Sequence, residues 1–272
     1  MTASPETYLA ELETFRQQRA SAIGAANSWL ALAGLFWLEE GENSLGSSAD
    51  CAVVLPGLAP RIGALWLEGE SVRLESSIPV EIDGQPQTQA ELHSDKSGKP
   101  TRVNIGELSF IVLRRGTHHA VRLWDNHNAG RTATLDWFAP DPAFRVEATF
   151  VAEPRTLEIG LSTGFEILEY SPSPGYVRFS LGGQEHRLVA QSAEPEKRLF
   201  FNFKDPTNAS QTYGAGRFLT TDGVKDGKVT LDFNYATNPY CAYTDHATCP
   251  LPPAENRLSV AVVAGEKRYN HG

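Results

Sequence analysis

The stretch AVVLPGLAPRIGALWLEGESVRLESSIPVEIDG, residues 52–84, decides the fold class of this chain of 272 residues. It contains four short apolar runs, which are AVVL (52–55), ALWLEG (64–69), SVRLES (71–76) and PVEIDG (79–84). Short runs that are separated by Gly, Pro and Asp are typical of β-strands joined by tight turns. Their close spacing predicts an antiparallel β-sandwich.

The same pattern continues toward the C-terminus. After a polar stretch, residues 85–101, which we expect to be a loop, the predicted strands are 108–116, 119–125, 144–150, 157–161, 165–170, 176–181, 185–190, 199–203 and 229–233. Almost no helical pattern separates these runs. Many short strands in sequence predict a second, antiparallel and barrel-like β domain, because closure removes exposed strand edges.

The beginning of the chain is different. Ser4 and Pro5 form a typical helix start, and apolar residues follow at a mostly helical period, at Tyr8, Leu9, Leu12, Phe15 and Ile23. We therefore predict an all-β protein with three parts. These are an N-terminal helical segment (1–40), a β-sandwich (41–115), and a C-terminal barrel-like domain (116–272) that a Pro-rich segment closes at one end.

Composition and charge argue against several classes of partner and location. The chain is 41% hydrophobic and 21% charged, as expected of a globular protein with a sizeable core. Its net charge of −9 argues against nucleic acid and anionic membranes as partners. The N-terminus carries acidic residues where a secretory signal needs a basic and then an apolar region. No apolar stretch approaches the roughly 20 residues of a membrane-spanning helix. We expect a cytoplasmic protein.

One resemblance begins at GENSLGSSADCAVVLPGLAPRIGALWLEGESVRL, residues 41–74. The order of glycine, small polar loop, aliphatic strand and Pro-Arg turn resembles a forkhead-associated β-sandwich, a family that recognises phosphothreonine. The family's phosphate-binding residues are not retained here. Ser47 stands where the family has an arginine, Gly63 ends the turn that the family ends with histidine, and Asp83 replaces the usual asparagine. A phosphate needs charge-assisted donors, so we predict that the sandwich does not bind phosphothreonine.

A second resemblance covers most of residues 28–269. The segments WFAPDPAFRVEATF (137–150), TYGAGRFL (212–219) and LDFNYATNPYCAYTDHATCPLPPAENRLSVAVVAGEKRY (231–269) are similar to the bacterial domain of unknown function 1684 family. Its members end in a similar series of Asn-Pro-x-Cys, Cys-Pro-Leu-Pro-Pro, Glu-Asn and Ala-Gly-Glu. The resemblance implies no established activity, so the chemistry has to be argued from individual residues.

The Pro-rich segment raises its own question. Cys241, His246 and Cys249 have the residue types of a zinc site, but no second CxxC or His pair lies nearby, so the fourth ligand would have to come from elsewhere, such as Asp245 or His119. A disulfide between Cys241 and Cys249 is geometrically possible, although a reducing cytoplasm argues against it. A third interpretation, which we favour, is a pair of buried thiols in an irregular, packed segment. We expect no stoichiometric metal.

Polar residues on the predicted strands supply candidates for a site. Asp232 and Asn234 share one face of their predicted strand, and Arg217 lies among glycines that allow close backbone approach. We expect Arg217 and Asp232 to face one another or a shared ligand, as a site or as a buried pair that fixes the strand register. The candidate ligand-binding residues are Arg122, Asp125, Tyr213, Arg217, Asp232, Asn234 and Tyr243.

These observations favour a small-molecule-binding protein whose pocket lies in the C-terminal β domain, since barrel mouths are common ligand sites. One alternative is a hydrolase-like enzyme that uses Asp232 or Asp125 as general base and an arginine to stabilise negative charge. Another is an interaction module that acts through the sandwich. The sequence has no dinucleotide fingerprint, phosphate-binding P-loop or G-x-S-x-G motif, and we expect no cofactor. It leaves the ligand, any reaction and the oligomeric state open.

Overall fold

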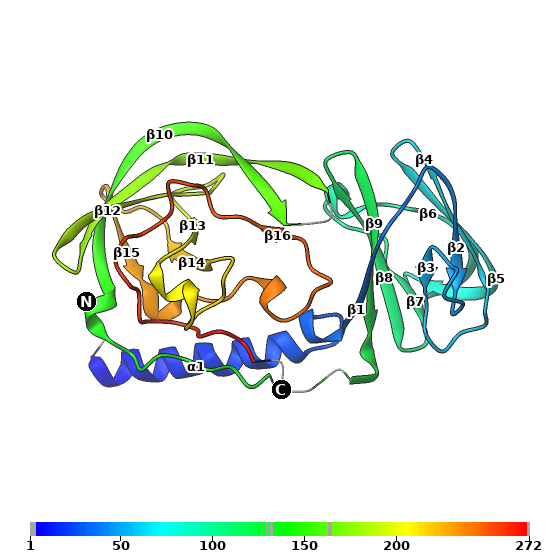
Figure 1. Cartoon of the computed structure of the whole chain (residues 1–272), viewed down its shortest axis with the longest axis horizontal. Helices are drawn as coiled ribbons and strands as arrows, with labels where there is room; N and C mark the ends of the chain where they lie inside the picture. The colour runs from blue at the N-terminus through cyan, green and yellow to red at the C-terminus, as the bar shows by residue number, and fades with distance from the viewer. Residues whose placement is uncertain (1–3, 129, 131–132, 163–164, 271–272) are drawn as a thin grey trace. The chain divides into compact units, whose positions relative to one another are not determined.

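The computed structural model describes residues 4–128, 130, 133–162 and 165–270. Strands are the predominant element, and an α-helix begins near the N-terminus (Figure 1). The chain forms two compact units. We call Ser21–Ala133 the sheet unit, and Met1–Ala20 together with Thr134–Gly272 the barrel unit. The all-β class and the helical start are therefore confirmed.

The sheet unit contains the strands β1 (Leu32–Trp37), β2 (Gly41–Gly46), β3 (Val53–Val54), β4 (Gly63–Glu68), β5 (Ser71–Ile82), β6 (Gln85–Leu92), β7 (Val103–Ile105), β8 (Leu108–Arg115) and β9 (His118–Asp125). Short 3₁₀ turns lie at Trp29–Ala31 (η1), Asp95–Ser97 (η2) and Asn126–Asn128 (η3). Hydrogen bonds join the strands in the order β1-β9-β8-β7-β5-β4-β2-β3, and β6 pairs with β5. Only the short β2–β3 pairing among the described strands is parallel.

The predicted alternation of apolar residues builds the core of the sheet unit. In β5, Val72, Leu74, Val80 and Ile82 are all buried, whereas most of the residues between them are exposed or half-buried. They pack in one large apolar cluster with residues from the other strands. Burying such side chains stabilises the fold by about 1.5–3 kcal/mol each. Period-two alternation was thus a reliable signal here.

A two-residue turn explains where β5 ends. Asp83 and Gly84 both have positive φ angles, 50° and 75°, and Ile82 pairs with Gln85 across them. Such a turn favours Asp-Gly and matches the twist of a hairpin. The predicted loop over residues 85–101 is therefore wrong in its first half, because residues 85–92 form β6. This strand was missed because most of its side chains are polar and exposed.

The two units divide the chain at other places than the sequence predicted. The predicted boundary between residues 115 and 116 falls in the turn of the β8–β9 hairpin, whose strands pair from Leu108 to Asp125. β1, which we had assigned to the helical segment 1–40, pairs with β9 in the same sheet. The sheet unit consequently extends from Ser21 to Ala133. Backbone pairing between distant strands sets these boundaries, and local composition does not report it.

The barrel unit contains β10 (Arg145–Ser162), β11 (Glu166–Leu181), β12 (Gln184–Val189), β13 (Arg198–Phe203), β14 (Arg217–Asp222), β15 (Lys228–Asp232) and β16 (Cys249–Pro250). Its short 3₁₀ turns are Pro142–Phe144 (η4), Pro206–Ala209 (η5), Phe233–Tyr235 (η6) and Tyr240–Ala242 (η7). β12, β11, β10 and β15 form one sheet in this order, and β13 pairs with β14.

These strands form the nearly closed, barrel-like arrangement that the sequence predicted. β14 lies beside β15. A β-bridge between Phe200 of β13 and Gln191, which follows β12, places β13 next to the end of β12. The order β12-β11-β10-β15-β14-β13 thus returns toward its start. Its interior is filled by aromatic and aliphatic side chains, among them Phe201, Phe203 and Phe233, none of which has measurable exposure. In Figure 1, β10 and β11 arch over this unit.

The helix α1 (Pro5–Gly24) begins as its sequence predicts. Ser4 caps it, since its hydroxyl accepts a hydrogen bond from the Thr7 amide at 3.2 Å, and Pro5 occupies the first helical position. Leu12 is buried, and Phe15 packs on Trp137 and Tyr235 of the barrel unit. Leu9, which we expected on the apolar face, is 50% exposed. Among the described helices, none is long and apolar enough to cross a membrane.

Candidate functional site

A pocket of about 380 Å³ lies at the C-terminal end of β13 in the barrel unit. Three segments form its walls: the residues that follow β13, the turn that leads into β14, and the tail near residue 257. The backbone of Lys204 bonds the tail on both sides, through the Asn256 carbonyl and the Leu258 amide, each at 2.8 Å. The lining residues are Lys204, Asp205, Pro206, Asn208, Ala209, Gly214, Arg257 and Leu258.

A buried ion pair lies beneath this pocket. Arg217 and Asp205 have fully buried side chains, and Arg217 Nη2 donates to Asp205 Oδ2 at 2.8 Å. Arg217 also donates to the carbonyls of Val262 and Ala264, and its guanidinium lies over the ring of Phe203. Burial lowers the pKa of Arg217, and the Asp205 carboxylate opposes this shift. The pair is a structural lock between β14, η5 and the tail.

The local sequence explains how Asp205 reaches this position. Asp205 is the N-cap of η5, where its carboxylate accepts from the Thr207 amide at 2.9 Å. Pro206 occupies the first helical position, and the Asn208 side chain accepts from the Asp205 amide at 2.7 Å. This capping box fixes the side chain of Asp205 between the turn and Arg217. Asn208 in turn donates to the Tyr213 carbonyl at 2.7 Å, which sets the opposite wall of the pocket.

A glycine lets the two walls approach one another. Gly216 has φ of 114°, and a Cβ atom there would lie 2.7 Å from the Phe203 carbonyl oxygen and 2.9 Å from Pro252 Cγ. Only a residue without a side chain fits this conformation and this space. The sequence predicted close backbone approach around Arg217. The structure shows it, and the approaching groups are other parts of the chain.

Positive charge dominates the rim of the pocket. Two acidic residues of the same segments are already engaged, because Asp205 pairs with Arg217 and Glu255 pairs with both Arg155 and Arg187. Lys204 is half-buried and Arg257 is exposed, and neither forms an ion pair with any residue that the structure describes. In a chain of net charge −9, two cations without ion-pair partners around one concavity create a local positive potential.

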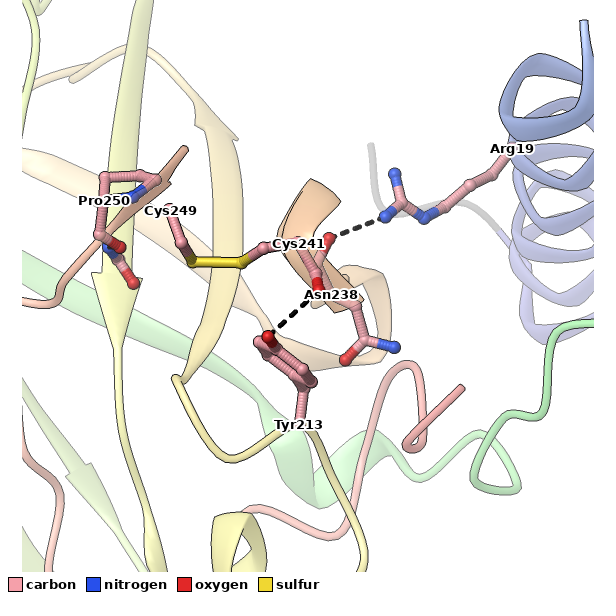
Figure 2. The surroundings of a disulfide bond; sticks show 7 residues. Arg19, Tyr213, Asn238, Cys241, Cys249 and Pro250 are labelled. Carbon is pink, nitrogen blue, oxygen red and sulfur yellow. Dashed lines mark hydrogen bonds between the residues drawn. A yellow bond between two sulfur atoms is a disulfide. The ribbon is translucent and has the colours of Figure 1, made fainter. Parts of the chain in front are cut away.

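Tyr213 connects the pocket to the Pro-rich segment. It precedes Gly214 in the pocket wall, and its hydroxyl donates to the Cys241 carbonyl at 3.0 Å (Figure 2). Burial raises the pKa of Tyr213, and the nearby Asp245 adds to this. Cys241 forms a disulfide with Cys249, with the two Cα atoms 5.7 Å apart. The interpretation of these cysteines as buried free thiols is therefore wrong.

Beyond the disulfide lies a buried polar network around Glu266, which is 1% exposed. Arg19 of α1 donates to Glu266 at 2.8 Å. It also donates to the Asn238 carbonyl at 2.8 Å, as Figure 2 shows. Tyr243 donates to the same carboxylate, and Asn238 does so through its amide and its side chain. Burial raises the pKa of Tyr243, and so does the carboxylate. Burial alone would lower the pKa of Arg19, but Glu266 raises it. The network holds the start of the Pro-rich segment.

The expected contact between Arg217 and Asp232 is wrong. Asp232 ends β15, where it caps η6, and its ion-pair partner is Arg145 at 3.5 Å. Its other contacts are Tyr8 at 3.2 Å and the Asn234 amide at 3.1 Å. Asn234 is fully buried and bonds the backbone of Asp141 through both ends of its side chain. The Asp-x-Asn pattern therefore marks a turn that is locked by hydrogen bonds, because β15 stops before Asn234.

Arg122 and Asp125, the remaining candidates, belong to the sheet unit. Arg122 is buried, its guanidinium lies over the ring of Trp29, and burial lowers its pKa to about 10, with Arg115 contributing. Asp125 ends β9 and accepts a hydrogen bond from the His127 amide at 3.0 Å. They do not belong to the unit that holds the pocket. The predicted set is thus divided, and only Tyr213 and Arg217 among the described candidates adjoin the pocket.

No metal centre is apparent among the described residues, where no group of three or more His, Cys, Asp or Glu side chains gathers. The disulfide also removes Cys241 and Cys249 as thiolate ligands. Whether the protein takes up a metal stays a prediction that elemental analysis can test.

Sequence reasoning missed the residues that matter most here, namely Lys204, Asp205, Arg257, Arg19 and Glu266. One signal was present: Asp-Pro-Thr-Asn at residues 205–208 has the order of an N-cap, a proline at the first helical position and an asparagine at the third. The pairing of Arg19 with Glu266, which are 247 residues apart, left no local signal.

Comparisons with known proteins agree with the resemblance that the tail suggested. A family model described as "Protein of unknown function (DUF1684)" matches residues 131–267, just over half of the chain. An uncharacterized protein from Haloarcula marismortui, whose structure was determined by solution NMR, is 38% identical over 49% of this chain and 75% of that one, with a TM-score of 0.41. Among curated proteins, none matches.

Proposed function

The chain belongs to the DUF1684 family of proteins of unknown function, and we propose that it binds a small organic anion, a carboxylate or phosphate ester, in the pocket between Lys204 and Arg257. The observation that carries this proposal is that both cations line one pocket and neither has an ion-pair partner in the described chain. Arginine binds carboxylate and phosphate oxygens in pairs, and lysine adds a compact charge.

The remaining walls suit the non-ionic part of such a ligand. Pro206, Ala209 and Leu258 offer apolar surface, and the pocket volume of about 380 Å³ is within the usual range for small ligands. Asp205 and Asn208, which also line the pocket, bond within the protein. Affinity therefore comes from the two charges, and selectivity comes from the apolar walls.

The alternatives receive less support. A hydrolase that uses Asp232 as general base needs a carboxylate with a free oxygen, but Asp232 contacts Arg145, Tyr8 and Asn234. An interaction module needs donors in the sheet unit. The exposed Arg61 there pairs with Asp50 at 2.8 Å, which supports the prediction that phosphothreonine is not bound. The forkhead-associated resemblance and the cytoplasmic location stay predictions.

Titration calorimetry with citrate at low ionic strength tests the proposal. We expect saturable binding that weakens as salt rises, and at least a tenfold loss of affinity in Lys204→Gln/Arg257→Gln. The matched control is Arg178→Gln/Lys225→Gln, which removes the same charge from positions that do not line this pocket and should bind as the wild type does. Equal losses in both variants would show only a general charge effect and would contradict a site at Lys204 and Arg257.

A further inference from the structure

The disulfide does not line the pocket, but hydrogen bonds connect the chain on either side of it to both walls. On one side, the Cys241 carbonyl accepts the Tyr213 hydroxyl at 3.0 Å, and Tyr213 precedes Gly214 in one wall. On the other side, Cys249 is followed by Pro250, whose carbonyl accepts a hydrogen bond from Asn202 at 2.9 Å. Asn202 lies two residues before Lys204 in the other wall. Figure 2 shows the disulfide between Tyr213 and Pro250.

The second connection continues to Arg257. Asn256 donates to the Asn202 carbonyl at 2.9 Å, and its own carbonyl accepts from the Lys204 amide at 2.8 Å. Asn256 is fully buried. Asn256 therefore connects the segment after Cys249 to β13 beside Lys204, and its side chain also bonds the backbone of Val189 at the end of β12.

Apart from Tyr243, which bonds Glu266, few hydrogen bonds between described residues hold the loop that the disulfide closes. Residues 244–248 contain no helix or strand, and β16 has only two residues. Within this part of the chain, the His246 amide donates to the Thr244 hydroxyl at 3.2 Å. The start of the loop is held by the Glu266 network and its end by β10, so the disulfide is the covalent tie between two separately anchored halves.

We propose that the Cys241–Cys249 disulfide is a redox-sensitive clamp that keeps the two walls of the anion pocket at their binding distance. This inference rests on the proposed function. A cellular dithiol is the reductant: one of its thiolates attacks the sulfur of Cys241, which is the more exposed cysteine, and Cys249 leaves as a thiolate and takes a proton. The second thiol of the reductant then displaces Cys241 and becomes oxidised. Reduction releases the tie, and the affinity for the anion falls.

The clamp makes the affinity for the anion depend on the redox environment. In an oxidising compartment the disulfide persists and the pocket binds its ligand. In a reducing compartment, such as the cytoplasm that the sequence predicts, the open form prevails until an oxidant restores the bond. Oxidation would then switch ligand binding on.

Citrate affinity of the full-length protein, measured before and after treatment with dithiothreitol, tests the clamp. Alkylation and mass spectrometry count the thiols, and circular dichroism confirms that the fold is retained. We expect the Kd to rise at least fivefold on reduction and to return on reoxidation. Cys51→Ala, which removes the buried free cysteine, should respond as the wild type does. Tyr213→Phe breaks the link to Cys241, and its response should fall below twofold.

The double variant Cys241→Ala/Cys249→Ala should bind as weakly as the reduced wild type, with or without dithiothreitol. If this variant does not fold, the citrate affinity of the reversibly reduced wild type tests the clamp instead. A reduced, folded protein that binds citrate within twofold of the oxidised one overturns the clamp but leaves the proposed function intact. An oxidised protein that binds neither citrate nor phosphate overturns the proposed function, and the clamp with it.

Discussion

Two arginines adjoin the same pocket and differ in almost every physical respect. Arg217 has no exposure, and the protein itself supplies its partners, which are the Asp205 carboxylate and two backbone carbonyls. Arg257 is exposed, and the one acidic residue close to it in the sequence, Glu255, is bound to other arginines. Arg217 maintains the structure, whereas Arg257 remains available for a ligand.

The comparison teaches how to separate structural charges from functional ones. A buried charge is tolerated only when its partners are in place, so its removal damages the fold. An exposed charge contributes little to stability. An exposed charge at the rim of a pocket is therefore a candidate for ligand binding. Three measurements test this distinction.

The largest expected effect is on Arg217. Arg217→Met leaves the Asp205 carboxylate buried without its cation and should lower the free energy of unfolding by about 3–5 kcal/mol. Urea denaturation followed by fluorescence measures this loss. In Arg217→Met/Asp205→Asn, no uncompensated charge remains, while the asparagine oxygen can still cap η5, so a large part of the stability should return. A single variant within 1 kcal/mol of the wild type would contradict the assignment of Arg217 as a lock.

An intermediate effect concerns His119, a buried group that lacks the partners Arg217 has. His119 is 2% exposed, and neither ring nitrogen has a hydrogen-bond partner in the described structure. Burial lowers the pKa of His119, and the charges of Arg114 and His118 lower it further. Glu70 and Glu40 have the opposite, smaller effect and raise this pKa. The folded state therefore disfavours the protonated ring.

The sign of the resulting pH dependence follows directly. Below the unfolded pKa of about 6.5, the unfolded state binds a proton that the folded state resists, so stability falls as the pH decreases. One proton contributes a slope of at most about 1.4 kcal/mol per pH unit. Urea denaturation of the wild type and of His119→Phe between pH 7.5 and 5 checks this, and the variant should have the smaller slope. Equal slopes would mean that His119 does not titrate differently on folding.

The smallest expected effect on stability is that of Arg257. Arg257→Gln should leave the free energy of unfolding within about 0.5 kcal/mol of the wild type, because an exposed side chain without an ion pair loses little on substitution. Its citrate affinity should nevertheless fall. Thermal denaturation and calorimetry on the same preparation provide both values. A clear loss of stability together with unchanged binding would reverse the roles that we assign to Arg257 and Arg217.

The sequence by itself determined those features that depend on neighbours along the chain. Short apolar runs located both halves of β5, which the sequence analysis had separated into two strands, and Ser4 and Pro5 marked the start of α1. Family membership was also visible in the Pro-rich tail. Each signal is local, because backbone conformation and side-chain alternation are set over a few residues.

Only the tertiary structure decided which polar groups meet. The sequence suggested Asp232 for Arg217, but the fold supplies Asp205. It brings Arg19 to Glu266, and it closes a disulfide that the expected compartment had argued against. Strand pairing also moved the boundary between the units past residue 115. An ion pair forms between whichever groups the backbone brings within about 4 Å, and residue type and spacing along the chain do not carry that information.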